Sequence, residues 1–228
     1  MPAVGITDHG NMHGAYELWR AAVDSGVKPI IGIEAYVTPE TARQDKTRVS
    51  WDTNWTPVPG HARNPDDVSG GGLITHLTMW AENDEGLVNL IKASSVANLE
   101  GRVMRYPRMD KEVLSTYSKG VIASSGCPSG IIQTRLRLGQ FDEALRAAGE
   151  FQDIFGKDNF YIELMDHGLS IESKVTGDLL TIAKKLGAPL LATNDSHYVM
   201  EADKDAQDAM LCINSGATLD DPNRFKFE

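Results

Sequence analysis

The segment 3–37, AVGITDHGNMHGAYELWRAAVDSGVKPIIGIEAYV, decides the fold class. It opens on a short apolar run over 3–6, which polar residues follow at once. Apolar residues then recur at helical spacing over 12–25, and Gly26 stands where a glycine commonly ends a helix. The run 30–37 has the composition of a buried strand. Strand, helix and strand in this order predict a βαβ unit of an α/β protein.

The rest of the chain continues this alternation. Strands are expected at 73–80, 120–124, 160–165 and 189–193. Helices are expected at about 84–98, 110–117, 128–138, 141–155 and 170–186, with a last one from about 201. Strands separated by helices usually pair in parallel, so we expect a parallel sheet within one domain spanning 1–228. A loop insertion at about 39–72 is rich in proline and glycine, and Trp51 and Trp55 are candidates to anchor it.

The composition is that of an ordinary globular protein. The 228 residues suit one or two domains, and 41% apolar with 24% charged residues excludes a disordered chain or a disulfide scaffold. We find no apolar run of about 18 residues and no signal peptide, so no membrane partner is expected. Two distant cysteines fit a reducing, cytoplasmic location. The net charge of -10 disfavours diffuse binding to phosphate backbones, but not a small metal-loaded site.

Metal-ligating side chains lie in or just after the expected strands. This group is His9, Glu34, His76, Cys127, Asp195 and His197. Strand ends of a parallel barrel converge on one rim, and imidazole, thiolate and carboxylate are ligands for Zn, Fe and Mn. Each residue alone has an ordinary explanation, such as a structural hydrogen bond or a buried thiol. Glu34 is more informative, because a carboxylate within an apolar strand needs a partner or a metal. The joint pattern predicts a polynuclear metal site.

Two further signals are weaker. Asp8 is a candidate to orient the ring of His9, and His167 is a possible rim or substrate contact. Basic residues around Tyr106 form either a phosphate-binding cluster or, more simply, a solvated face; they are Arg102, Arg105, Arg108 and Lys111. We find neither a P-loop nor a Gly-x-Ser-x-Gly nucleophile elbow.

Several longer segments, in a fixed order, resemble one known family. They are AVGITDHGNMHGAYELWRAA at 3–22, GVKPIIGIEAYVTP at 26–39, THLTMWAEN at 75–83, GCPSG at 126–130, QTRLRLGQ at 133–140, LATNDSHYV at 191–199 and DPNRFKFE at 221–228. Together they resemble the PHP (polymerase and histidinol phosphatase) domain of bacterial replicative DNA polymerase III alpha subunits, in particular the actinobacterial type. The resemblance covers nearly the whole chain.

The resemblance implies a distorted (β/α)7 TIM-like barrel whose rim binds up to three divalent metal ions (Zn, Mn or Fe). It also implies a 3′–5′ proofreading exonuclease that hydrolyses phosphodiesters at the DNA primer 3′ end. That activity would belong to a DNA-directed DNA polymerase in contact with other replisome subunits. Carried over position by position, the ligands are His9, Glu34, His76, Cys127, Asp195 and His197. Asp166 and His167 are not ligands in that pattern.

The chain departs from the family pattern at its beginning. The family starts with a strand carrying His-x-His and then an Asp, and these three ligands have no counterpart here. We therefore expect a fragment: a barrel lacking its first strand, with fewer metal ions, impaired exonuclease activity and no polymerase centre. Two alternatives stay open, a stand-alone PHP phosphoesterase acting on a small phosphate monoester and a non-catalytic structural or docking barrel. The segments 126–130, 133–140 and 221–228 favour the polymerase type over the stand-alone enzyme.

Overall fold

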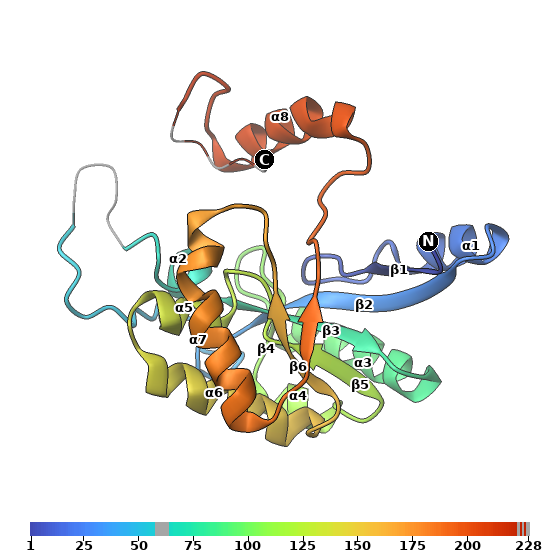
Figure 1. Ribbon diagram of the computed structural model, residues 1–228, viewed down its shortest axis with the longest axis horizontal. Helices are drawn as coiled ribbons and strands as arrows, with labels where there is room; N and C mark the ends of the chain where they lie inside the picture. Colours follow the sequence, from blue (N-terminus) through green and yellow to red (C-terminus); the bar gives the residue numbers. More distant parts are fainter. Residues whose placement is uncertain (58–63, 223, 225, 227–228) are drawn as a thin grey trace.

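The computed structural model describes residues 1–57 and 64–222, together with Arg224 and Lys226. The strands curl into a half-barrel, and helices pack against it (Figure 1). In the described part the sheet has the strand order β1-β2-β3-β5-β6-β7, and the short strand β4 pairs with β2. No helix of the described residues is long and apolar enough to cross a membrane.

The βαβ unit predicted from 3–37 is confirmed. Strands β1 (Ala3–Ile6) and β2 (Lys28–Val37) pair in parallel, and helix α1 (Ala15–Asp24) connects them. The remaining strands are β3 (Thr75–Ala81), β4 (Arg108–Met109), β5 (Val121–Ser124), β6 (Phe160–Leu164) and β7 (Leu190–Ala192).

The prediction of an all-parallel sheet is wrong at β3. This strand runs antiparallel to both of its neighbours, β2 and β5, whereas β1–β2, β5–β6 and β6–β7 are parallel pairs. The reason lies in the connection from β2 to β3, which is a long loop rather than a helical crossover, so the chain turns back at the end of β2. The curled α/β sheet agrees with the expected barrel class, and the (β/α)7 count stays a prediction.

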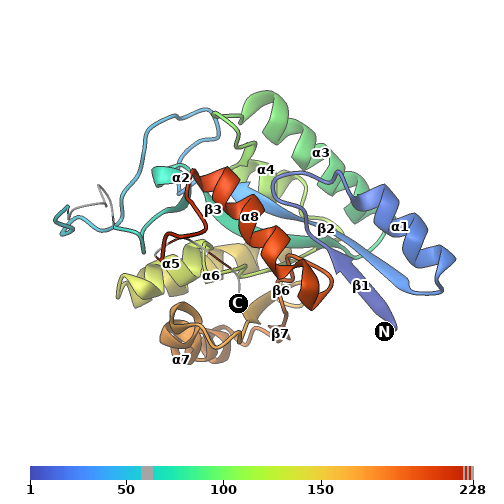
Figure 2. The ribbon, with the colours of Figure 1, turned by 90° about the horizontal axis from the view of Figure 1, so that it is seen from above.

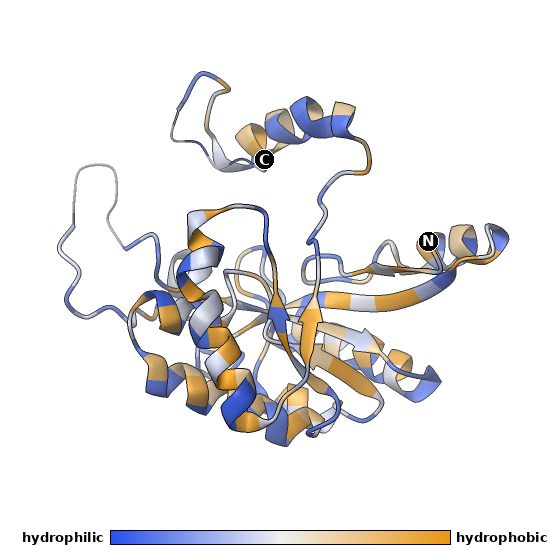
Figure 3. Cartoon of the chain, viewed as in Figure 1, coloured by the Kyte–Doolittle hydropathy of each residue, from blue (hydrophilic) through white to orange (hydrophobic). Residues whose placement is uncertain are grey.

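Side chains along β2 alternate between the apolar core and the opposite face of the sheet. Ile33, Ala35 and Val37 are buried in the apolar core, whereas Glu34 and Tyr36 point the other way. The helices that cover the core are α3 (Asp84–Glu100), α4 (Lys111–Thr116), α5 (Ile131–Arg137), α6 (Phe141–Phe155) and α7 (Ser170–Leu186). Figure 3 shows the mixed apolar and polar faces of α6 and α7, as expected for helices packed on one side.

The last helix lies apart from this core. A 3-10 turn (Glu201–Asp203) leads into α8 (Lys204–Ser215), which crosses above the sheet on the side away from α6 and α7 (Figures 1 and 2). Arg105 Nη1 donates a hydrogen bond to Asn214 Oδ1 at 2.9 Å, which links the segment before β4 to α8.

The predicted loop at 39–72 is anchored by Trp51. The side chain of Trp51 is 9% exposed, the Arg135 guanidinium carbon lies 3.8 Å from its ring centroid, and its carbonyl accepts a hydrogen bond from Gln140. The loop ends in a single turn, α2 (Ser69–Gly72), and residues 58–63 lie outside the described residues. Trp55, the second predicted anchor, is half-buried.

Arg108 is wholly buried, so the interpretation of the basic cluster as a solvated face is wrong for this residue. Its guanidinium donates to four backbone carbonyls, those of Gly101 and Leu73 at 3.3 Å, Arg43 at 2.6 Å and Asp45 at 2.7 Å. One side chain therefore connects the start of the long loop, its end and the segment before β4.

The start of the loop is also held by Glu40, whose backbone has a left-handed φ of 65°. Its carboxylate accepts hydrogen bonds from Arg135 and Arg146, each at 2.5 Å. Burial alone would raise the pKa of Glu40, but these two guanidinium groups bring it below its ordinary value of 4.5. A lowered pKa means that the contacts contribute stability above pH 4.5, and that this contribution is lost as the pH falls through the lowered pKa.

Replacing Glu40 with glutamine should therefore lower the free energy of unfolding at neutral pH by about 1–3 kcal/mol. The difference from the unchanged chain should shrink in acid, where Glu40 itself becomes neutral. Urea denaturation of both chains at neutral pH and in acid measures this. Glu82→Gln, at an exposed position after β3, is the matched control and should be nearly neutral. An equal loss at both pH values would contradict the charge-based explanation.

Candidate metal centre

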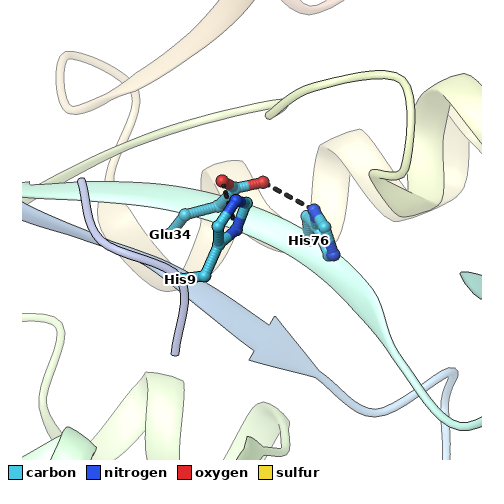
Figure 4. Close-up of side chains that lie close together, drawn as sticks. All are labelled: His9, Glu34 and His76. Atoms are coloured by element: carbon cyan, nitrogen blue, oxygen red, sulfur yellow. Dashed lines mark ion pairs between the residues drawn. The ribbon is translucent and has the colours of Figure 1, made fainter. Parts of the chain in front are cut away.

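Glu34 lies at the centre of the site, between two histidines. Its Oε2 is 2.9 Å from His9 Nδ1, and its Oε1 is 2.5 Å from His76 Nδ1 (Figure 4). The carboxylate is 5% exposed. The three residues come from the turn after β1, from β2 and from the start of β3, so segments far apart in the sequence meet at one point.

Backbone pairing sets the position of His9. Gly10 N–H donates to Glu34 O at 2.8 Å and Glu34 N–H donates to Asp8 O at 3.0 Å, which extends the β1–β2 ladder beyond the end of β1. Gly10 has a φ of 66°, and a Cβ atom there would lie 2.7 Å from the ring of Tyr36. A glycine is therefore required directly after His9, both for the turn and for the close approach of Tyr36.

Cys127 joins the same cluster from the turn after β5. Its Sγ lies 3.3 Å from His76 Nδ1 and donates to Glu34 Oε1 at 3.2 Å. His76 is tied to the same turn through its backbone, because its N–H donates to Ser129 O at 3.0 Å. Four of the six predicted ligands, His9, Glu34, His76 and Cys127, are thus in direct contact.

The other two predicted ligands lie on the turn after β7. The ring of His197 is 5.7 Å from the ring of His9, centroid to centroid, and its Nδ1 lies 2.7 Å from Asp195 O. Asp195 has a left-handed φ of 44°, which is uncommon for a residue other than glycine. Its carboxylate is close enough to Glu34 and His9 for their charges to affect its pKa.

The electrostatics of the site indicate a deficit of positive charge. Burial would raise the pKa of Glu34, but hydrogen bonds from His76 and His9 bring it well below its usual range. Burial, and then the charge of Glu34, raise the pKa of Asp195. Burial and the charges of both carboxylates also raise the pKa of the Cys127 thiol. A bound cation would relieve this crowding of acidic groups.

The donor set fits a divalent transition metal. One donor atom from each of His9, Glu34 and His76 lies within 4.8 Å of the others, and Cys127 contacts two of them. Imidazole nitrogen, carboxylate oxygen and thiolate sulfur are the ligands that zinc, iron and manganese take from proteins. The contacts between these donors thus define a cluster of side chains with the chemistry of a metal site.

The two predicted outer residues have well-defined contacts. The carboxylate of Asp8 accepts a hydrogen bond from Gly14 N–H at 2.7 Å, just before α1. Its role in orienting the ring of His9 stays a prediction. His167 Nδ1 lies 2.6 Å from Glu172 Oε1, and His167 Nε2 lies 2.7 Å from Asn194 O. His167 therefore contacts the turn that carries Asp195 rather than the histidine–glutamate cluster.

Sequence reasoning missed Glu163, a buried carboxylate on β6. It is 3% exposed and lies close enough to Asp195 and Glu34 for their charges to raise its pKa further, after the main effect of burial. The signal that selected Glu34, a carboxylate within an apolar strand, applies equally to Glu163. Tyr36 was also missed; its ring stacks near His9 at 6.4 Å and lies 5.4 Å from His76, centroid to centroid.

The curled α/β sheet brings histidine, glutamate and cysteine from separate strands together at one rim. This arrangement agrees with the match of the chain to the PHP domain family model. That match covers residues 1–167, and the chain belongs to the PHP domain family. It is similar to the DNA polymerase III subunit alpha of Mycobacterium leprae, at 52% identity over 227 residues, and to that of Saccharopolyspora erythraea, at 53% over 228 residues. The relative from Thermus aquaticus is 41% identical over 231 residues.

These alignments cover 99–100% of this chain, but only 17–19% of the relatives' own length. The predicted resemblance to the PHP domain of polymerase III alpha subunits, with the higher identity to the actinobacterial ones, is confirmed.

Proposed function

We propose that this chain is part of the alpha subunit of a bacterial replicative DNA polymerase. We further propose that its rim site is a metal-dependent centre for phosphodiester hydrolysis at the 3′ end of DNA. The observation that carries the proposal is the buried carboxylate of Glu34, in contact with His9, His76 and Cys127. The similarity of the whole chain to polymerase III alpha subunits supports the polymerase context.

The residues of the chain have distinct roles in this proposal. His9, Glu34, His76, Cys127, Asp195 and His197 hold zinc, manganese or iron ions. When bound, such ions lower the pKa of a water molecule and neutralise charge that develops on the phosphoryl and leaving oxygens. His9 and His76 each contact Glu34 through Nδ1, and an imidazole can bind a metal through either ring nitrogen. With a net charge of -10, the chain would take up DNA at this site rather than along a broad surface.

The family pattern has three further ligands, His-x-His and a following Asp, which have no counterpart in this sequence. We therefore expect the 228-residue chain on its own to bind fewer than three ions and to hydrolyse DNA weakly. The proposed partners, the primer 3′ end and other replisome subunits, belong to the full polymerase.

The test combines metal content with a choice of substrates. The purified chain is loaded with Mn²⁺ or Zn²⁺, its metal content is measured, and it is given a 5′-labelled single-stranded oligonucleotide or a phosphate monoester. We expect bound metal and weak shortening of the DNA from its 3′ end, both lost in His76→Ala. Hydrolysis of the monoester alone would support a stand-alone phosphoesterase. Metal binding without any hydrolysis would support the non-catalytic barrel, and absence of metal binding would contradict the metal centre.

A further inference from the structure

The β6 strand supplies none of the six proposed ligands, yet its buried carboxylate touches both neighbouring strands. Glu163 Oε2 accepts a hydrogen bond from Ser124 Oγ on β5, and Oε1 accepts one from Thr193 Oγ1 just after β7, each at 2.5 Å. One carboxylate therefore bridges the ends of three adjacent strands. Two of these ends, those of β5 and β7, lead directly into the turns that carry Cys127 and Asp195.

A second bridge begins four residues further along the chain. The ring of His167 lies between Glu172 on α7 and the carbonyl of Asn194, with contacts of 2.6 Å and 2.7 Å. The N–H of His167 also donates to Glu172 at 2.8 Å, and Glu172 is buried. The imidazole is thus fixed on one side and holds Asn194 on the other.

These two bridges act on the residues directly before Asp195. Thr193 is held by Glu163, Asn194 is held by His167, and the next residue, Asp195, has a φ of 44°. A left-handed conformation is uncommon at a residue other than glycine and persists when the surroundings impose it. The segment 163–167 provides such surroundings, because it contacts the two consecutive residues before Asp195.

Fold stability alone does not account for Glu163. Burying a carboxylate is costly, and replacing a buried polar group together with its partners by apolar residues is often neutral or stabilising. The charges of Asp195 and Glu34 oppose the ionised form of Glu163 further. A carboxylate buried near other carboxylates is explained if its two hydrogen bonds are needed to hold Ser124 and Thr193 in position.

We propose that Glu163 and His167 are positioning residues that hold Asp195 in the backbone conformation required for metal binding. This inference rests on the proposed function, because it assumes that Asp195 is a ligand. Glu163 also fixes the approach to Cys127, since Ser124 Oγ in turn accepts a weak contact from Gly126 N–H at 3.4 Å.

Removing the hydroxyl of Thr193 is the most direct test of the positioning role of Glu163. Thr193→Val keeps the shape of the side chain but removes the hydrogen bond to Glu163, whereas Thr193→Ser keeps the hydroxyl. We expect Thr193→Val to weaken Mn²⁺ binding by about 10- to 100-fold, and Thr193→Ser to stay within about twofold of the unchanged chain. Titration calorimetry with Mn²⁺ measures both. Thr181→Val, the same change at an exposed site on α7, is the control and should leave the affinity unchanged.

His167→Ala is a second, independent variant, because its side chain is 31% exposed and its loss opens no large core cavity. It should weaken Mn²⁺ binding about tenfold while circular dichroism shows a folded chain. This variant keeps the test valid if Thr193→Val does not fold.

The outcomes separate the two proposals. If the unchanged chain binds no Mn²⁺, the metal centre fails and the positioning role fails with it. If it binds Mn²⁺ and both folded variants bind equally well, the positioning role alone is overturned. A loss of affinity in Thr193→Ser as large as in Thr193→Val would also overturn it, because the hydroxyl would then not be the cause.

Discussion

Replacing Glu34 with glutamine is expected to lower the affinity of the chain for Mn²⁺ or Zn²⁺ by more than about 100-fold, beyond the range typical of residues that only support ligands. The reason is the position of the carboxylate, which contacts His9, His76 and Cys127 at once. Glutamine has nearly the same shape but no charge, and its amide NH2 would face a nitrogen or sulfur that the carboxylate oxygen now pairs with. Hydrolysis of DNA, where measurable, should be lost together with metal binding.

Titration calorimetry of the metal-free chain measures the affinity, and circular dichroism checks that the variant is folded. Glu82→Gln makes the same chemical change at an exposed position and should bind metal like the unchanged chain. Equal affinity in Glu34→Gln would mean that Glu34 is not a ligand and that the cluster is a structural hydrogen-bond network.

Replacing Arg108 with methionine should have the largest effect on stability, a loss of about 3–5 kcal/mol in the free energy of unfolding. Methionine fills part of the same space but leaves the carbonyls of Leu73, Arg43 and Asp45 without this donor, whereas the Gly101 carbonyl keeps the backbone N–H of residue 108. Each buried carbonyl left unpaired costs about 1–3 kcal/mol before relaxation. A domain of typical stability, about 5–15 kcal/mol, would lose much of it.

Urea denaturation measures this loss. Arg102→Met is the matched control, because Arg102 is an exposed arginine in the same segment. Its effect should be within about 0.5 kcal/mol, as for most surface changes. If the two variants were equally stable, these carbonyls would have found water or other donors, and the connecting role of Arg108 would be contradicted.

Much of the secondary structure could be predicted from periodicity. The bounds of α6 and α7, Phe141–Phe155 and Ser170–Leu186, agree with the ranges expected from apolar spacing. The direction of β3 could not be predicted, because an alternating pattern reads the same in both directions. Only the connection before it, a long loop without a helical crossover, indicates that the strand turns back.

The candidate site could likewise be predicted from the sequence only in part. Ligand chemistry at strand ends selected His9, Glu34, His76 and Cys127, which the fold brings into contact. The burial of Arg108 could not be predicted, since a run of basic residues has the same composition in solvent and in a core. Contacts such as these depend on segments that meet only after folding, and no local pattern carries that information.

The reversal of β3 has a consequence for how this domain can vary. In an all-parallel barrel, the connection between two neighbouring strands starts at one rim and returns to the opposite one. Here β2 ends and β3 begins at the same rim, and His76 is the second residue of β3. The connection 38–74 therefore leaves and re-enters the sheet at the rim that carries the candidate metal centre. Because closing a longer loop costs little extra free energy, this connection can be lengthened or replaced without altering how β2 pairs with β3.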